Sequence, residues 1–257
     1  MPVLIGTSGW HYRHWRGGFY PAPLPARSWL EHYAQRFATV EVNSAFYRLP
    51  EAATFANWAA VLPDDFVVSV KASRYLTHVR RLRDPEEPVR RLMERASELG
   101  SKLGPVLVQL PPNLRIDTPA LARCLKAFPP GTRTAVELRH ESWFVPAARR
   151  VLEEVGAAAC LTDTAGHPGP LWRTTDWGYL RFHGGRGRPP SCYGRAALAT
   201  WARRLAELWP GTADVFVYFN NDAHGCAPRD ARRFAAAVRR AGLPATRVPP
   251  ASETPLT

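Results

Sequence analysis

The chain has 257 residues and a formal net charge of +12, with 34 basic residues against 22 acidic ones. This length matches the roughly 250 residues of a single barrel domain and allows a large core without disulfides. No apolar run approaches the about 18 residues of a membrane span, and the N-terminus lacks the basic and apolar regions of a secretory signal. We therefore expect a cytoplasmic protein with no membrane partner.

Eight short apolar runs, each ending in polar or charged residues, form the main pattern of the chain. They cover residues 3–8, 38–43, 66–71, 106–110, 134–139, 157–163, 178–183 and 215–221. Between them, helical patterns predict helices at 26–37, 51–61, 85–102, 118–127, 145–155, 195–208 and 228–241. Eight strand-then-helix units predict an α/β fold, a TIM-type (β/α)8 barrel that forms one domain over residues 1–248.

Two segments depart from this regularity. Residues 164–176, in the sixth unit, contain two glycines and two prolines, so we expect a loop with little helix and an irregular barrel there. Residues 249–257 are polar and rich in proline, and we expect a disordered tail.

The cysteines and the positive charge both have an unremarkable interpretation. Cys124, Cys160, Cys192 and Cys226 form no CxxC pair, so we expect free, buried thiols rather than a zinc or redox site. The charge would suit a nucleic-acid partner. However, only three of the 34 basic residues are lysines, and arginine doublets recur on the predicted helices, which is typical of a biased composition and of solvated helix faces.

In a (β/α)8 barrel the C-terminal ends of the strands form the active-site face. A barrel that served only as a scaffold would not need a group of polar residues there. The strand ends of this chain bring together Glu41, Asn43, Lys71, Gln109, Glu137, Arg139, Asp163, Arg181, His183, Asn220 and Asn221.

The acidic members of this group have two interpretations of about equal weight. Glu41, Glu137 and Asp163, together with His183, could act as acid and base or hold a divalent cation. Alternatively, the glutamates form buried ion pairs with Lys71, Arg139 or Arg181. A metal site is the less favoured option, because no HxxE-like spacing supports it.

The cationic members indicate an anionic ligand. Lys71, Arg139 and Arg181 end strands, and His78, Arg74 and His140 are close to them in sequence. The arginine fork suits phosphate and carboxylate. Lys71 could also act as a Schiff-base nucleophile if it is desolvated, although an ion pair with Glu41 or Glu137 is the favoured interpretation.

Two loops on the same face add further candidates. The Gly184-Gly185-Arg186-Gly187 segment and the segment from Asn220 to Gly225 follow the seventh and eighth strands, where many barrels bind phosphate. The alternative is a tight connection that needs positive φ. The loop 9–25 is aromatic and basic, with Trp10 and Tyr12 near its start and Tyr47 in a later loop. Such rings could stack on a base or sugar, but packing over the barrel mouth is the favoured interpretation.

Nine short motifs occur in a fixed order along residues 3–240. They are GTSGW at 6–10, EVNSAFY at 41–47, VKA at 70–72, TH at 77–78, QLPP at 109–112, ELRHESW at 137–143, DT at 163–164, RFHG at 181–184 and YFNND at 218–222. In these motifs the chain resembles the YecE-like family, domain of unknown function 72. One position departs from the family pattern, because Ala45 stands where a threonine is usual. The resemblance implies a TIM-barrel fold and supplies no reaction.

We therefore expect an enzyme (a hydrolase, isomerase or lyase) that acts on a small phosphorylated or carboxylated substrate. The expected catalytic residues are Glu41, Lys71, Glu137, His183, His78 and Asp163. The expected binding residues are Asn43, Tyr47, Gln109, Arg139, His140, Arg181, Gly184, Gly185, Asn220, Asn221 and Trp10. Single-stranded nucleic-acid binding and non-catalytic ligand binding are the alternatives. The sequence names no cofactor, leaves a divalent metal open, and does not determine the oligomeric state.

Overall fold

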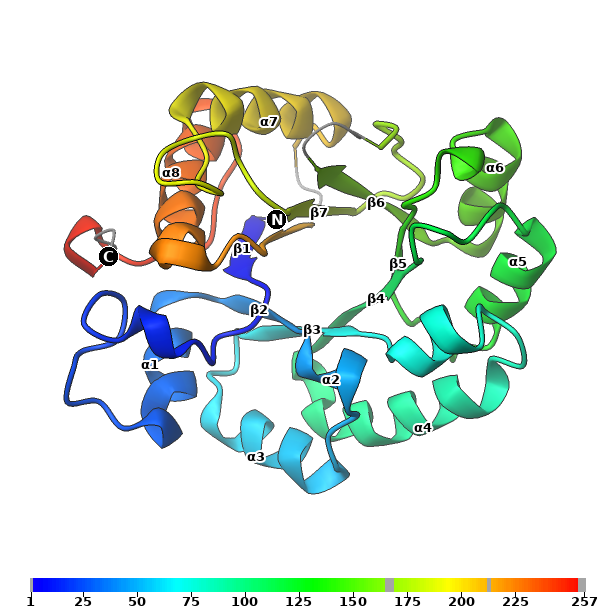
Figure 1. Ribbon diagram of the computed structural model, residues 1–257, viewed down its shortest axis with the longest axis horizontal. Coiled ribbons are helices and arrows are strands. Elements are labelled where there is room, and N and C mark those ends of the chain that lie inside the picture. Colours follow the sequence, from blue (N-terminus) through cyan, green and yellow to red (C-terminus); the bar gives the residue numbers. More distant parts are fainter. Residues whose placement is uncertain (1, 165–168, 212–213, 254–257) are drawn as a thin grey trace.

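The computed structural model describes residues 2–164, 169–211 and 214–253. In this part of the chain, eight parallel strands form a nearly closed barrel with helices around it (Figure 1). The predicted TIM-type fold is therefore confirmed. The strands are β1 Val3–Thr7, β2 Thr39–Val42, β3 Val67–Lys71, β4 Leu103–Gln109, β5 Thr134–Glu137, β6 Ala158–Asp163, β7 Gly178–Phe182 and β8 Val215–Phe219.

The helices lie where the apolar periodicity predicts them, within a few residues, except that the helix predicted at 85–102 ends at Ala96 and is followed by a 3-10 segment, Ser97–Lys102. They are α1 Trp29–Arg36, α3 Ala52–Val61, α4 Glu86–Ala96, α5 Thr118–Lys126, α6 Pro146–Val155, α7 Arg195–Leu208 and α8 Cys226–Arg240. A short helix that was not predicted, α2 Ser44–Tyr47, follows β2. The described residues between β6 and β7, 164 and 169–177, contain no helix, so the irregular sixth unit is also confirmed.

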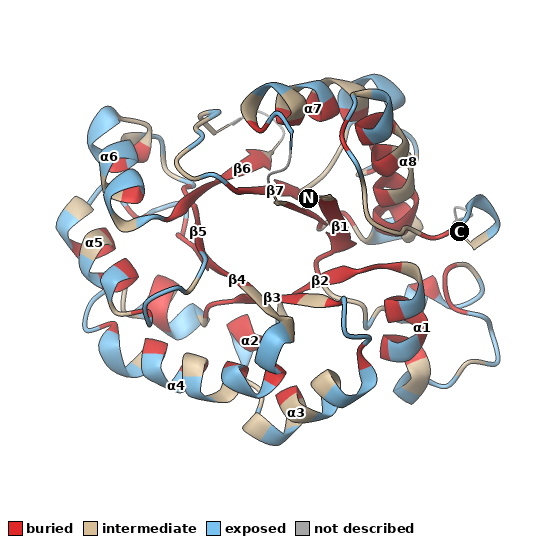
Figure 2. Ribbon diagram, turned by 180° about the vertical axis from the view of Figure 1, so that it is seen from behind, coloured by how far each residue is buried: buried red, intermediate tan, exposed pale blue. Residues whose placement is uncertain are grey.

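Strand alternation divides the buried side chains into two cores. Side chains that point into the barrel, such as Leu107, Tyr179 and Tyr218, form an inner core. Side chains that point outward pack against the helices in a larger core. Figure 2 shows the strands buried and the helices buried mainly on the side that faces them. The same alternation, continued toward the C-terminal strand ends, directs Glu41, Lys71, Gln109, Glu137 and Arg181 into the mouth of the barrel.

The barrel closes between β1 and β2 without a full ladder of backbone hydrogen bonds. The described residues show one parallel bridge at this seam, between Ser8 and Glu41. Tyr33 of α1 replaces part of the ladder, because its hydroxyl accepts from the Thr7 N–H (3.0 Å) and donates to the Thr39 carbonyl oxygen (3.1 Å). A Cβ on Gly6 would lie 2.2 Å from that carbonyl oxygen, so glycine is required for the strands to approach. The seam thereby brings Ser8 beside Glu41.

One prediction about the cysteines is wrong. Cys192, in the loop after β7, forms a disulfide with Cys226, the first residue of α8. Spacing along the chain could not reveal this pair, because 34 residues separate the two cysteines and only the packing of α8 against the loop brings them together. Cys124 and Cys160 are buried and free, as predicted for all four.

In the tail that was predicted to be disordered, residues Ala251–Glu253 form a 3-10 turn. The Glu253 carboxylate pairs there with the Arg36 guanidinium of α1. Residues 254–257 lie outside the described part of the chain. None of the described helices is long and apolar enough to cross a membrane.

Candidate active site at the C-terminal strand ends

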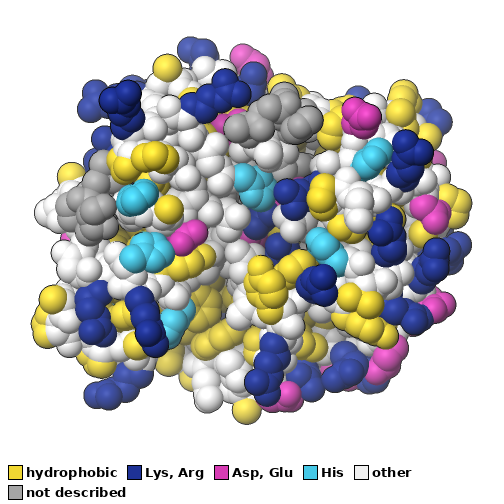
Figure 3. Space-filling view, viewed as in Figure 1, with side chains coloured by type: hydrophobic (Ala, Val, Ile, Leu, Met, Phe, Trp, Pro, Cys, Tyr) yellow, Lys and Arg dark blue, Asp and Glu magenta, His cyan; other side chains and the backbone are white. Residues whose placement is uncertain are grey.

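The C-terminal ends of the strands carry a dense group of titratable side chains. Figure 3 shows histidine side chains around the middle of this face, with basic and acidic side chains in the hollow between them. Six of the described histidines lie in the segments that follow β1, β3, β5, β7 and β8: His11, His14, His78, His140, His183 and His224.

Arg181 of β7 lies between two buried glutamates. Its Nη2 atom is 2.8 Å from Glu41 Oε1, and its Nη1 atom is 2.5 Å from Glu137 Oε2. All three side chains are at most 1% exposed. Buried charges are tolerated when they are paired and hydrogen-bonded, which this arrangement provides. Of the two interpretations left open by the sequence, buried ion pairing therefore holds for both glutamates.

The carboxylate of Glu41 is fully buried and surrounded by donors. It accepts hydrogen bonds from the Ser8 hydroxyl (2.7 Å), the Tyr179 hydroxyl (2.7 Å) and the Arg181 Nε atom (3.2 Å). Burial, followed by the charge of Glu41, raises the pKa of Tyr179 well above its usual value, so this hydroxyl stays protonated and donates. These contacts leave Glu41 poorly placed to take a proton from a ligand.

Glu137 is also buried, but two of its partners face the mouth. Gln109 Nε2 donates to its Oε1 atom at 2.9 Å, and His183 Nε2 lies 3.1 Å from the same oxygen. Arg139 Nε lies 3.7 Å from it and is partly exposed. Burial alone would raise the pKa of Glu137, but the adjacent Arg181 and His183 hold that pKa well below its ordinary range. Glu137 is therefore ionised; it accepts hydrogen bonds from Gln109, His183 and Arg181, and Arg139 adds a longer ion-pair contact.

A chain of hydrogen bonds fixes the orientation of His183. Because Nε2 faces the ionised Glu137, this nitrogen carries the proton in the neutral ring. Nδ1 is then an acceptor, and the Asn220 amide nitrogen lies 3.4 Å from it. Asn220 Oδ1 in turn accepts from the Asn43 amide nitrogen at 3.4 Å. The donor or acceptor role of each group thus determines the role of its neighbour, from Glu137 through His183 and Asn220 to Asn43.

Lys71 of β3 differs from the other cations of the mouth. It is 8% exposed, and no carboxylate among the described residues lies within 4 Å of its Nζ atom. Its ammonium group instead lies 4.0 Å from the centre of the Phe46 ring. Burial, and then the charge of Arg181, lowers the pKa of Lys71 from 10.5 to about 8. The predicted ion pair with Glu41 or Glu137 is therefore wrong, because Arg181 occupies both carboxylates.

His78 also contacts the Phe46 ring. The two ring centres are 5.0 Å apart in an edge-to-face arrangement. Burial and the nearby cations, Lys71 first, lower the pKa of His78, so it adds a neutral imidazole to this side of the mouth.

Three other candidates lie outside the group around Arg181. The described contacts of Asp163 include no hydrogen bond or ion pair with Glu41, Glu137 or Arg181, and burial raises the pKa of its carboxyl. His140 accepts from the Ser142 N–H and caps the turn Glu141–Trp143. Tyr47 stands at the rim with 81% of its surface exposed.

The predicted phosphate site between the last two loops requires a correction. The Gly184 N–H donates to the Tyr193 hydroxyl, and the Gly185 N–H donates to the Ser191 carbonyl oxygen, so neither is turned toward a ligand. A Cβ on Gly185 would lie 2.3 Å from the Cys192 carbonyl oxygen. Close approach of two backbone segments, rather than positive φ, therefore requires this glycine. Asn221 is buried and donates to Asp230 of α8 and to Ser191.

The mouth shows no ready metal site in the described residues. The one described trio of potential ligand atoms that all lie within 4.8 Å of one another is Cys192, Cys226 and Asp230, and the disulfide uses both sulfur atoms. Within the group around Arg181, donors from Ser8, Tyr179 and Arg181 already occupy the Glu41 carboxylate.

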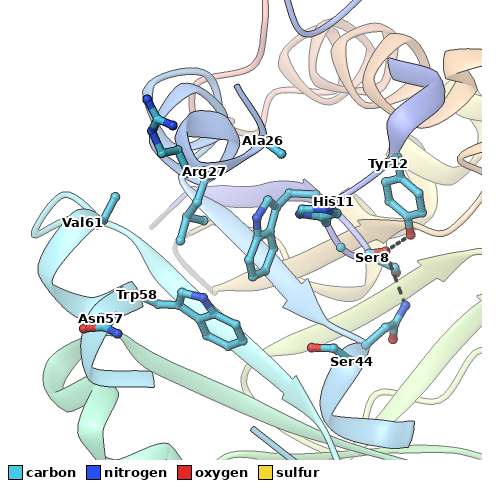
Figure 4. Close-up of a pocket in the computed structure, with 13 residues that line it drawn as sticks. Ser8, His11, Tyr12, Ala26, Arg27, Ser44, Asn57, Trp58 and Val61 are labelled. Carbon is cyan, nitrogen blue, oxygen red and sulfur yellow. Dashed lines mark hydrogen bonds between the residues drawn. The ribbon is translucent and has the colours of Figure 1, made fainter. Parts of the chain in front are cut away.

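The aromatic loop after β1 is mostly packing, as the favoured interpretation predicts. Trp15, Phe19 and Tyr20 are buried, and Tyr20 stacks on Trp29 of α1 with ring centres 4.7 Å apart. Trp10 has a different position. It lines a cavity of about 660 Å³ beside the mouth (Figure 4).

The sequence of the chain matches the family described as "Protein of unknown function DUF72" over residues 4–254. The chain belongs to the DUF72 family. It is 26% identical to UPF0759 protein YunF of Bacillus subtilis over 258 residues, which covers 88% of this chain and 90% of YunF. It is 30% identical to UPF0759 protein YecE of Escherichia coli over 143 residues, which covers 55% of this chain and 50% of YecE.

Solved structures of DUF72 proteins share the fold. The protein from Thermotoga maritima superposes with a TM-score of 0.80 at 26% identity, covering 93% of this chain and 100% of that one. A DUF72 protein from Enterococcus faecalis gives a TM-score of 0.78 at 20% identity, covering 96% and 98%. The family resemblance inferred from the sequence motifs is thus confirmed.

Three residues of this site were not among the predicted catalytic and binding residues. Ser8 and Tyr179 hold Glu41, and Phe46 lies against Lys71. Alternation along β7 could have revealed Tyr179, because it points to the same side as Arg181 and His183. Phe46 was predicted only as one of several aromatic residues that could stack on a ligand ring, and its contact with Lys71 could not be found from periodicity because it lies on the short helix α2.

Proposed function

We propose that this DUF72 protein is an enzyme that binds a small anionic substrate in the barrel mouth and transfers a proton through His183. The observation that carries the proposal is Lys71, a nearly buried ammonium group with no carboxylate within 4 Å among the described residues. A buried charge without a protein counterion is costly unless a ligand supplies one.

The charge balance of the mouth supports an anion. Glu41 and Glu137 contribute two negative charges, whereas Arg181, Arg139 and Lys71 contribute up to three positive ones. Arg181 is fully engaged by the glutamates, so Arg139 and Lys71 are the groups that would contact a phosphate or carboxylate. Arginine binds such groups with its planar fork, and lysine binds them as a point charge.

His183 is the best-placed acid–base residue. It is partly exposed at the mouth, and the ionised Glu137 orients its ring from below. A carboxylate behind an imidazole selects one tautomer and stabilises the protonated ring during proton transfer. Under this proposal His183 takes or gives the proton at Nδ1, where a ligand atom replaces the 3.4 Å contact with Asn220. Glu137 orients the ring through Nε2, and Glu41 supports Arg181. Hydrolysis, isomerisation and lyase chemistry all use such a pair.

Nucleic-acid binding is the alternative that the rim favours, because Tyr47 is highly exposed there and could stack on a base. This alternative predicts affinity that falls steeply with salt. Binding of a small anion without turnover is the other alternative.

The first test is a thermal-shift panel with sugar phosphates, dicarboxylates, nucleotides, divalent metals and short single-stranded DNA. A small anion should raise the melting temperature of the wild-type protein, and Lys71→Met should abolish the shift. Lys126→Met is the matched control, because Lys126 borders a surface hollow with Thr134 at the opposite end of the barrel. A shift that survives in Lys71→Met, or one seen with DNA alone and lost at higher salt, would argue against the proposal. A bound anion that stays chemically unchanged would identify a binding protein.

A further inference from the structure

We infer that the substrate carries a planar, apolar ring in addition to its anionic group, and that a cavity beside the mouth holds this ring. The inference rests on the proposed function, because it extends the ligand of the same site. The cavity has a volume of about 660 Å³ and lies between the loop after β1, the start of α1, the start of α2 and α3. Small-molecule sites commonly have volumes of about 300–1,000 Å³. We call it the Trp10–Trp58 cavity.

The walls of the Trp10–Trp58 cavity suit a ring. The two indole rings meet edge to face, with centres 5.1 Å apart and planes at 86°. Leu30, Ala26 and Val61 add apolar surface. Figure 4 shows the Trp58 ring reaching from α3 toward the end of the cavity at Ser8. Two indoles at right angles form a corner where a planar group can stack on one ring and contact the edge of the other.

The cavity shares two residues with the active site. Ser8 and Asn43 line it, and both also belong to the polar network of the mouth. The Ser8 hydroxyl donates to Glu41. The Asn43 amide nitrogen lies 3.4 Å from Asn220 Oδ1, and Asn220 contacts His183. A single small molecule could therefore reach both the cavity and the acid–base residue.

Asn43 also offers an unused acceptor at this junction. Its amide nitrogen faces two oxygen acceptors, the Ser8 carbonyl and Asn220 Oδ1, so the orientation of the amide is determined. Its Oδ1 atom is buried and has no hydrogen-bond partner in the described part of the chain. Buried acceptors are normally satisfied, so we assign this atom to a donor on the ligand between the ring and the anionic group.

The distribution of charged residues indicates which part of the ligand lies in the cavity and which lies in the mouth. No carboxylate is among the described residues that line the cavity, and its titratable members are His11, Tyr12 and Arg27. Arg27 is exposed, and its guanidinium is turned away from Trp58 (Figure 4). The apolar corner therefore suits the uncharged ring, and the acidic group belongs beside Lys71 and Arg139.

Two matched pairs of probes test this inference by isothermal titration calorimetry. They are 3-phenylpropyl phosphate with propyl phosphate, and 4-phenylbutyrate with butyrate, so each pair differs only in the ring. At least one ring compound should bind wild-type protein about tenfold or more tightly than its partner, because it buries an aromatic ring. Ala26→Trp should fill the cavity from an exposed position and remove this advantage, whereas the exposed control Ala22→Trp should keep it. Trp58→Ala should reduce the advantage as well.

The outcomes separate the inference from the proposed function. Lys71→Met should weaken both members of a pair equally. If both members of each pair bind wild-type protein with equal affinity, or if the ring advantage persists in Trp58→Ala and in Ala26→Trp, the ring site is wrong and the anion site stands. Suppose that Ala26→Trp removes the tighter binding of the ring compound but Lys71→Met changes no affinity. The anion site at Lys71 is then wrong, and so is the inference that one ligand occupies both the cavity and the mouth.

Discussion

The ammonium group of Lys71 lies 4.0 Å from the centre of the Phe46 ring, whereas Glu137 in the same mouth pairs with His183 at 3.1 Å. A cation against an aromatic face is stabilised by the ring quadrupole, but less than it would be by a carboxylate in a dry site. The Phe46 ring therefore offsets only part of the desolvation free energy of the Lys71 ammonium group. As a result, the charge of Lys71 is sensitive to pH and to ligands.

The first prediction concerns the pH dependence of stability. The pKa of Lys71 is lowered from 10.5 to about 8, so between these values the unfolded chain binds a proton that the folded protein does not. Stability must then rise with pH in this window, by at most about 1.4 kcal/mol per pH unit. Urea unfolding of wild type and of Lys71→Met, from pH 7 to 10.5, should show a wild-type gain that the variant lacks. Parallel curves for the two proteins would contradict the shift.

The second prediction concerns Arg181. Arg181→Met leaves two buried carboxylates without their counterion, which should lower the free energy of unfolding by about 3–5 kcal/mol at neutral pH. The loss should shrink toward pH 5, because protonation removes the unpaired charges. The matched control is Arg149→Met, which breaks an exposed pair with Glu153 and should cost less than about 1 kcal/mol. Equal losses in the two variants would show that the buried pairs are not formed.

The third prediction concerns the tautomer of His183. In protein labelled with nitrogen-15 at histidine, the neutral ring should show a protonated Nε2 and an acceptor Nδ1, with the signal assigned by its absence in His183→Asn. Glu137→Gln should disturb this state, because the amide offers a donor as well as an acceptor. Once a substrate is known, Glu137→Gln should also lower turnover by about 100-fold or more. A proton on Nδ1 in the wild-type protein would refute the proposed orientation.

The fourth prediction concerns the disulfide. Unreduced, denatured protein should react with a thiol reagent at two cysteines, Cys124 and Cys160, and not at four. Reduction should lower the free energy of unfolding by about 2–4 kcal/mol, since the bond closes a long loop in the unfolded chain. The double variant Cys192→Ser/Cys226→Ser should have this lower stability without reductant and should not respond to it. Four reactive thiols before reduction would disprove the bond.

Much of the fold and part of the site could be predicted from local patterns. The apolar runs and helical periods placed the strands and helices, and alternation placed Glu137, Arg181 and His183 together at one end. The ion-pair partners of these residues could not be predicted in the same way. The sequence favoured Lys71 as the counterion of a glutamate, whereas the structure gives both glutamates to Arg181 and places Lys71 on Phe46. Several strand ends offered cations, and their order along the chain does not say which of them lies between two carboxylates.

The sequence by itself determined the barrel, its family and the face on which polar groups gather. These features follow from periodicity and motifs, which can be recognised from residues that are close together in the sequence. Only the tertiary structure decided that the glycine loop is closed by its own hydrogen bonds, that Asp163 stays outside the group around Arg181, and that Trp10 and Trp58 enclose a cavity. These features depend on distances between side chains far apart in the chain. Packing and desolvation set such distances, and no short segment of the sequence reveals them.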